Sequence, residues 1–165
     1  LLVSIAIVYL LMTILFESFK YPFIIMLSVP PAAAGGVIGL FLLNLTTFQP
    51  LDMLTILGFV ILSGIVVNNA ILLVHRTLQT IKNNNLSINN AILDATNSRI
   101  RPIFMSTLTS IFGMLPLVIF PGAGSELYKG LGSVILGGLS LSAILTLLIV
   151  PPMLKLFLSE KEKIV

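Results

Sequence analysis

The sequence predicts an all-α membrane protein, built as a bundle of five transmembrane helices. Hydrophobic residues make up 57% of the 165 residues and charged residues only 9%, whereas a soluble domain carries roughly 25% charged residues. The mean hydropathy is strongly positive, at +1.13. The apolar residues form long blocks rather than an alternating strand pattern, which excludes a membrane β-barrel.

Five apolar blocks account for the predicted helices. Crossing the hydrocarbon takes about 20 residues at about 1.5 Å each, and the last four blocks reach that length. The first block opens the sequence without an initiator Met, so we expect a C-terminal piece of a longer protein or a truncated gene. We treat residues 1–165 as one transmembrane domain fragment. Its predicted spans are 1–16, 22–43, 51–74, 102–120 and 131–154.

Prolines interrupt three of these spans. Proline lacks a backbone N–H and clashes with the preceding helical turn, so it bends or breaks a helix. Pro30 and Pro31 should therefore kink or locally break the second span, and Pro151 and Pro152 the fifth. Pro116 should do the same in the fourth span.

Basic residues gather on one side of the predicted bundle. Because five spans alternate sides, the connections 17–21 and 75–101 and the C-terminal tail share one face. That face carries eight of the nine Lys and Arg residues, and Lys129 is the exception. The positive-inside rule places this face in the cytoplasm. The basic cytoplasmic face of a protein in the lipid bilayer explains the high pI of about 9.5. We therefore expect no nucleic-acid partner.

The connection 75–101 is the only long one. Its run Lys82-Asn83-Asn84-Asn85 is typical of a polar loop, and Ser87 suits the N-cap of a short helix. One apolar stripe at helical spacing follows, formed by Ile88, Ala91, Ile92 and Ala95. We expect this short helix to lie along the cytoplasmic membrane surface in a structural role.

Small residues four apart mark where helices should touch. Such spacing lets two backbones approach closely where lipid supplies no hydrophobic drive for association. The pairs are Gly35 with Gly39, Ser133 with Gly137, and Gly138 with Ser142. We therefore predict helix-packing contacts at Gly35, Gly39, Gly137, Gly138 and Ser142.

Two adjacent carboxamides, Asn68 and Asn69, lie inside an otherwise apolar span. Polar side chains in hydrocarbon face another helix or a solute path. The alternative is that they only join two helices by a hydrogen bond. Arg99, at the border before the next span, shares one helix face with Ser106 in that span, because they are seven residues apart. If the two spans face each other, Asn68, Ser106 and Arg99 form one hydrogen-bonding line; otherwise Arg99 is an interfacial anchor.

Several chemistries have no residues to support them. No carboxylate, Lys or His lies deep within a predicted span, although an ion-driven carrier needs a titratable or anionic group near the midplane. We expect that group outside this sequence. No Ser/His or Asp/Asp pair lies within the spans, so we expect no enzyme and no catalytic residues. His75 is the single His of a chain without Cys, and one residue is too few to bind a metal ion. We therefore expect no metal and no cofactor.

Five segments, in order, resemble a known family. They are Phe16-Glu17-Ser18-Phe19 followed by Tyr21-Pro22-Phe23, Gly64 to Val74, Arg99 to Thr107, Gly113-Met114-Leu115-Pro116-Leu117, and Gly122-Ala123-Gly124-Ser125-Glu126. Over essentially the whole chain, the sequence resembles the C-terminal transmembrane part of resistance-nodulation-division (RND) efflux transporters. The resemblance covers helices eight to twelve of a twelve-helix transporter and is greatest in the hydrophobe/amphiphile multidrug branch.

The resemblance implies a proton-driven exporter in the bacterial inner membrane. It also implies a homotrimer that works with a periplasmic adaptor and an outer-membrane channel, together with the N-terminal part of the same transporter. In the family, acidic residues on the fourth helix take up protons. Asn68, Arg99 and Ser106 occupy the positions of the family's relay Lys, Arg and hydroxyl residue, and Asn69 lies beside them.

Asn68 departs from the family pattern. A carboxamide donates and accepts hydrogen bonds but cannot carry the charge that a Lys alternates against a carboxylate. We therefore hypothesise a reduced acidic set opposite Asn68, with a single Asp in place of two acids; a degenerate, inactive transporter is the other possibility. The heavy-metal branch resembles this chain less, because it tends to place an acid in this region, where the chain has two amides.

Two other functions are compatible with a five-helix bundle. A Sec-type protein-export subunit has a related helix arrangement. A non-transporting membrane scaffold would use the same helices only for assembly. An upstream reading frame with large periplasmic domains would favour the exporter, and a start codon close to Leu1 would favour a scaffold or a decayed remnant.

Overall fold

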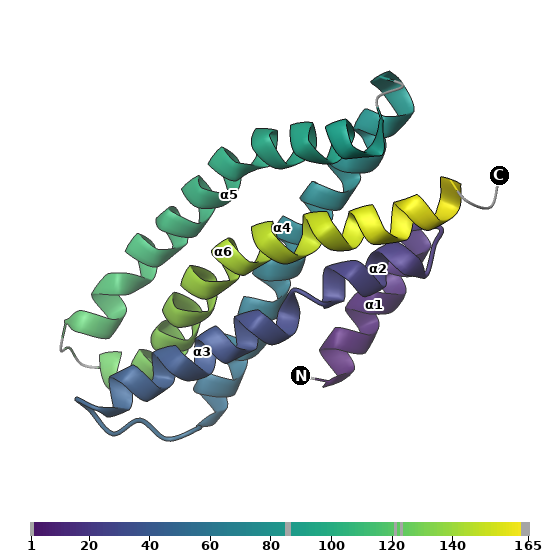
Figure 1. Cartoon of the computed structure of the whole chain (residues 1–165). Helices are drawn as coiled ribbons and strands as arrows, with labels where there is room; N and C mark the ends of the chain where they lie inside the picture. Colours follow the sequence, from purple (N-terminus) through teal and green to yellow (C-terminus); the bar gives the residue numbers. More distant parts are fainter. Residues whose placement is uncertain (1, 85–86, 121, 123, 163–165) are drawn as a thin grey trace.

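The computed structural model describes residues 2–84, 87–120, 122 and 124–162, and the regular elements among them are six helices (Figure 1). The C-terminal end, residues 85–86 of the long connection and Ala123 of the last family segment lie outside the described residues. The helices are α1 (Leu2–Phe16), α2 (Lys20–Met26), α3 (Val29–Asn44), α4 (Met53–Asn84), α5 (Ile88–Ile119) and α6 (Ser125–Glu162).

Four segments of the described chain are long and apolar enough to cross a membrane. They are Lys20–Asn44, Met53–Lys82, Ile88–Ile119 and Leu127–Leu158. Helix α1 is apolar but has only 15 residues, which is about 22 Å of helix against about 30 Å of hydrocarbon. The predicted all-α membrane fold is confirmed. Its first apolar block forms α1, which is shorter than the four candidate spans.

The second span is divided into α2 and α3, which is the interruption that its prolines predict. Pro30 and Pro31 lie in the first turn of α3, where a missing N–H costs little. The break leaves few backbone groups unpaired, because Leu27 N donates to Phe23 O (3.2 Å) and Ser28 N to Ile25 O (3.1 Å). Helices α5 and α6, in contrast, continue through their internal prolines.

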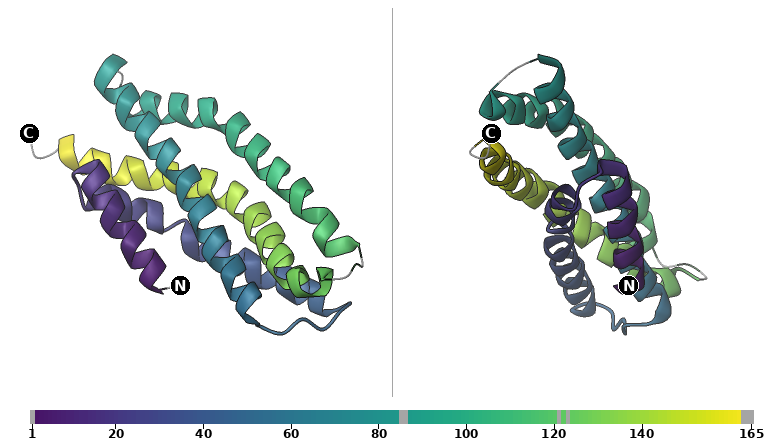
Figure 2. Two further views of the ribbon diagram at one scale, coloured as in Figure 1. Left: turned by 180° about the vertical axis from the view of Figure 1, so that it is seen from behind. Right: turned by 90° about the vertical axis from the view of Figure 1, so that its right-hand side faces the viewer.

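The connection 75–101 differs from the expectation of a polar loop and a separate surface helix. Helix α4 continues to Asn84 and α5 begins at Ile88, so the connection consists of the ends of two long helices (Figure 2). The physical reason is that the predicted apolar stripe does not end at residue 95. Its buried members continue in phase along α5, as Ala91, Ile92, Ala95, Ile103 and Thr107, so one face of the whole helix packs on the bundle.

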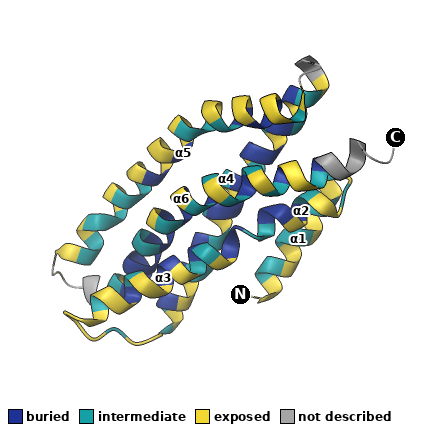
Figure 3. Ribbon diagram, viewed as in Figure 1, coloured by how far each residue is buried: buried dark blue, intermediate teal, exposed yellow. Residues whose placement is uncertain are grey.

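Helix α6 is the centre of the bundle. It packs against α3, α4 and α5. Half of the residues in its most apolar stretch are buried (50%), compared with 11% in the corresponding stretch of α5. Figure 3 shows the buried residues concentrated where α3, α4 and α6 meet. One core cluster lies near the basic end and includes Ile24, Ile25, Val74, Val150 and Leu154. A second lies towards the other end and includes Ala32, Leu62, Val134, Ile135 and Leu139.

Small residues bring α3 and α6 into direct backbone contact. A Cβ on Gly35 would lie 2.7 Å from Gly137 O, and a Cβ on Gly39 would lie 3.0 Å from Gly137 Cα. A Cβ on Gly138 would instead lie 2.6 Å from Leu62 Cδ1 of α4. Ser142 is buried, and its hydroxyl donates to Leu139 O (3.2 Å). The backbones of Gly35, Gly39, Gly137 and Gly138 thus lie at the α3–α6 contact, since a Cβ on Gly35 would also lie 3.1 Å from Gly138 Cα.

Asp52 caps the start of α4 in the connection that precedes it. Its Oδ1 accepts hydrogen bonds from Thr55 N (2.8 Å) and from Thr55 Oγ1 (2.6 Å). These bonds favour the ionised carboxylate, first through the Thr55 hydroxyl and then through its amide, and lower the pKa of Asp52 from its ordinary value. The cap satisfies a free N–H group of the first turn and favours the start of α4 at this position.

The α3–α6 contact predicts a contrast between two glycines. Gly137→Ala should destabilise the chain by about 1–3 kcal/mol, because its methyl group overlaps the α3 backbone. Gly113→Ala should be neutral or slightly stabilising, because nothing lies within 4 Å of a Cβ there and alanine favours a helix. Thermal unfolding in detergent measures both. Equal melting temperatures for the two variants would contradict the glycine contact.

Candidate functional site

Helix α4 has one face that the described residues leave uncovered. Asn68 lies on this face, one turn after Gly64, and its side chain is exposed. The neighbours along the same face are exposed too, at the spacing of three and four residues that defines a helix stripe. We call the stripe the outer face of α4; it consists of Leu57, Ile61, Gly64, Asn68, Leu72 and His75.

The opposite side of α4 fixes this orientation. Val66, Val67, Ala70 and Val74 are buried against the rest of the bundle. Asn69 lies between the two sides and is half-buried. The two carboxamides therefore differ in position, and Asn68 is the one that points away from the described bundle.

The hydroxyls of Ser106 and Thr109 on α5 are satisfied within their own helix, whereas the Thr107 hydroxyl is buried and has no partner among the described residues. Ser106 Oγ donates to Ile103 O (3.0 Å), and Thr109 Oγ1 donates to Met105 O (2.8 Å). Such local bonds let a hydroxyl remain in hydrocarbon without a partner helix. Ser106 and Thr109 therefore place no demand on a neighbouring segment, in contrast to the unpaired hydroxyl of Thr107.

The carboxamides of Asn68 and Asn69 and the guanidinium of Arg99 differ from these hydroxyls. Among the described residues, none of the three side chains has a hydrogen bond or an ion pair. Arg99 is half-buried on α5, whereas Asn68 is exposed on α4. An amide and a guanidinium without partners within a membrane domain are costly, so each requires a partner from elsewhere, headgroups or water included.

The expected hydrogen-bonding line is absent from the described residues, where no bond joins Asn68, Ser106 and Arg99. Figure 2 shows α4 and α5 meeting at their connected ends and then diverging. Both helices pack against α6. Asn68 and Ser106 therefore each need a further segment if they belong to one network.

Gly64 adds room beside Asn68. A Cβ built on Gly64 meets nothing within 4 Å, in contrast to the crowded glycines of α3 and α6. An open glycine in a helix leaves space for another backbone without requiring one, and Gly113 of α5 is open in the same way. The outer face of α4 thus combines a carboxamide with a place where a second helix can approach closely.

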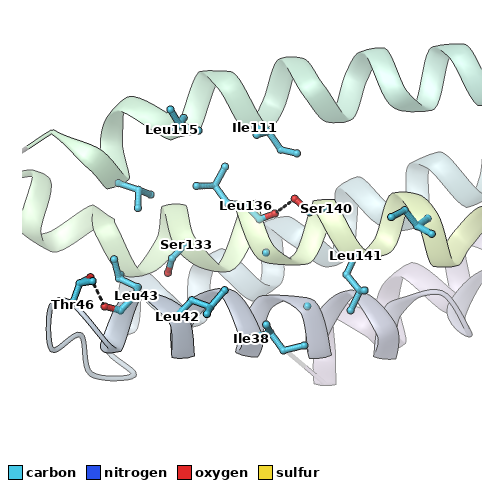
Figure 4. Close-up of a pocket in the computed structure, with 15 residues that line it drawn as sticks. Ile38, Leu42, Leu43, Thr46, Ile111, Leu115, Ser133, Leu136, Ser140 and Leu141 are labelled. Carbon is cyan, nitrogen blue, oxygen red and sulfur yellow. Dashed lines mark hydrogen bonds between the residues drawn. The ribbon is translucent and has the colours of Figure 1, made fainter.

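An apolar cavity of about 720 Å³ lies between α3, α5 and α6, and sequence reasoning did not predict it. Figure 4 shows Ile38, Leu42, Ile111 and Leu115 on its walls. Two of its hydroxyls donate to nearby backbone carbonyls, Thr46 to Leu43 O (2.9 Å) and Ser140 to Leu136 O (2.7 Å). No sequence pattern predicts such a cavity, because its walls come from segments far apart in the chain. Its chemistry suits hydrocarbon and not an ion.

A family model described as the AcrB/AcrD/AcrF family matches residues 1–158. Among curated proteins, "Multidrug resistance protein MdtC" of Citrobacter koseri is 43% identical over 150 residues, covering 91% of this chain. MdtC of Enterobacter sp. is 42% identical over the same length. MdtC of Escherichia coli O157:H7 is 40% identical over 166 residues, covering 97% of this chain.

The chain spans 14% to 16% of the length of these relatives. Among solved structures, the "X-ray crystal structure of a heavy metal efflux pump, crystal form I" superposes with a TM-score of 0.79. It is 25% identical in sequence, and the match covers 96% of this chain and 15% of that chain. Both matches therefore cover a small part of much longer proteins.

The orientation of α4 predicts different mobility at two positions two residues apart. The chain has no Cys, so a nitroxide label reports on one introduced thiol. A label on Asn68→Cys should give a mobile electron paramagnetic resonance spectrum, because the side chain is exposed. A label on Ala70→Cys, at a fully buried position, should be immobile. Similar spectra at both positions would contradict this orientation.

Proposed function

The chain belongs to the AcrB/AcrD/AcrF family of RND-type multidrug efflux transporters, and on that premise we propose that it is the C-terminal membrane part of a proton-driven exporter of hydrophobic or amphiphilic compounds. The observation that carries the proposal is the outer face of α4, where Asn68 has no partner among the described residues and Gly64 leaves room for one. This chain contributes the non-acidic side of the proton-relay network.

The relay requires a carboxylate from another part of the transporter. Asn68 hydrogen-bonds that carboxylate, Arg99 supplies a permanent positive charge, and Ser106 adds a hydroxyl that exchanges its local bond for one in the network. Because an amide does not neutralise a second acid, the facing helix carries a single Asp. Two adjacent acids at the facing position in the upstream sequence would contradict this part of the proposal.

The same proposal sets the location and partners. The protein lies in the bacterial inner membrane, with the connections 17–21 and 75–101 and the C-terminus in the cytoplasm. It acts with the N-terminal part of the same transporter, as a homotrimer, and with a periplasmic adaptor and an outer-membrane channel. The match to only 14% of MdtC supports a role as one part of a larger machine.

Multidrug export is favoured over heavy-metal export. The structural neighbour is a heavy metal efflux pump, but its sequence identity is 25%, compared with 43% for MdtC of Citrobacter koseri. Among the described residues, no group of three His, Cys, Asp or Glu side chains is placed to hold a metal ion. The family match over residues 1–158 also favours an exporter over a Sec-type subunit.

Arg99→Ala tests the relay in the full-length transporter. Export of a hydrophobic dye from cells should fall to the background level while the amount of protein in the membrane stays unchanged. Arg101→Ala is the matched control, because it removes an exposed arginine two residues away that the proposal does not use. If Arg99→Ala retained export at the control level, Arg99 would be an interfacial anchor. Absence of export by the unmodified transporter would instead indicate a scaffold or a degenerate remnant.

A further inference from the structure

A second pocket lies at the basic end of the bundle, between the start of α5 and the end of α6. Its volume is about 350 Å³. Asn89, Ile92 and Leu93 line it from α5, and Pro151, Pro152 and Lys155 line it from α6. The pocket is separate from the outer face of α4 and has no part in the proposed relay.

The walls and the mouth of this pocket have different chemistry. Ile92, Leu93 and the two proline rings present carbon, and a proline has no backbone N–H to offer. Water binds poorly in the space between such walls, because a buried water molecule needs two to four polar partners. The ammonium of Lys155 and the carboxamide of Asn89 are both exposed, and among the described residues neither has a hydrogen bond or ion pair.

The position along α6 places this mouth at the level of lipid headgroups. Lys155 directly follows the apolar segment 131–154, and long lysine side chains at such ends extend towards the interface. The same side of the bundle carries Lys20, Arg76, Lys82, Arg99 and Arg101. The acids on this side whose side chains are described are Glu17 and Asp94, and neither pairs with Lys155.

We infer that this pocket binds one anionic phospholipid. The lipid phosphate lies against Lys155 and Asn89, and an acyl chain lies along Ile92, Leu93 and the prolines. The charge of Lys155 is complementary to a phosphate, and basic pockets between membrane helices suit anionic headgroups. The apolar walls suit the hydrocarbon that surrounds this end of the bundle. A neutral lipid would contact the apolar walls but would not neutralise Lys155. A free phosphate would neutralise Lys155 but would leave the apolar walls uncovered.

Native mass spectrometry of the chain in detergent tests this inference. Phosphatidylglycerol should bind about fivefold more tightly than phosphatidylcholine, the difference expected for one lysine at a membrane surface. Lys155→Gln should remove this preference. Lys82→Gln is the matched control, since it removes an exposed charge on the same side without touching the pocket, and it should keep the preference.

Two further measurements separate the parts of the site. Leu93→Trp should weaken binding of both lipids, because Leu93 is 62% exposed and a larger ring there fills the pocket without disturbing the core. Glycerol 3-phosphate, which has a headgroup but no acyl chain, should not compete with phosphatidylglycerol. Equal binding of the two lipids would overturn the inference. So would an equal loss of the phosphatidylglycerol preference in Lys155→Gln and Lys82→Gln, or competition by glycerol 3-phosphate.

Discussion

Backbone contact between α3 and α6 is the interaction on which the rest of this bundle depends. Lipid tails are as apolar as leucine, so the helices gain nothing by hiding carbon from the solvent and associate instead through close packing. Gly35, Gly39 and Gly137 allow that packing, because each would place a Cβ inside the neighbouring helix. With α6 held against α3, the helices α4 and α5 pack on its remaining sides. The outer face of α4 is what remains uncovered.

Polar side chains in the bundle differ in whether their own helix satisfies them, and the hydroxyl of Thr107 is one that it does not satisfy. Hydroxyls such as those of Thr77, Ser106 and Ser133 donate to carbonyl groups of their own helices and need nothing further. Asn68, Asn69 and Arg99 have no such bond in the described structure. An amide has two donors and an acceptor, which one backbone carbonyl cannot satisfy. The side chains that need a hydrogen-bond partner from elsewhere are therefore identified by their unsatisfied donors and acceptors, and not by polarity alone.

Much of this architecture follows from the sequence, because the membrane imposes simple rules. Block length predicts the spans, and small residues spaced four apart predict where α3 and α6 meet. The long helices at 75–101 were not predicted, because the polar run 82–85 suggests a loop although the apolar stripe continues on both sides of it. The apolar cavity of α3, α5 and α6 was not predicted either, since it arises from tertiary packing. Residue types alone identify Asn68 as a candidate, but only the structure shows that it faces outwards.

The central claim is that the outer face of α4 belongs to a proton pathway completed by another part of the transporter. Proton flux through the full-length transporter, reconstituted in vesicles under a pH gradient, tests it most directly. Asn68→Leu keeps the size of the side chain and removes its hydrogen bonds, so proton flux should be lost, whereas Asn90→Leu at an exposed position on α5 should leave it intact. Undiminished flux in Asn68→Leu would contradict the claim and leave the face as a packing surface.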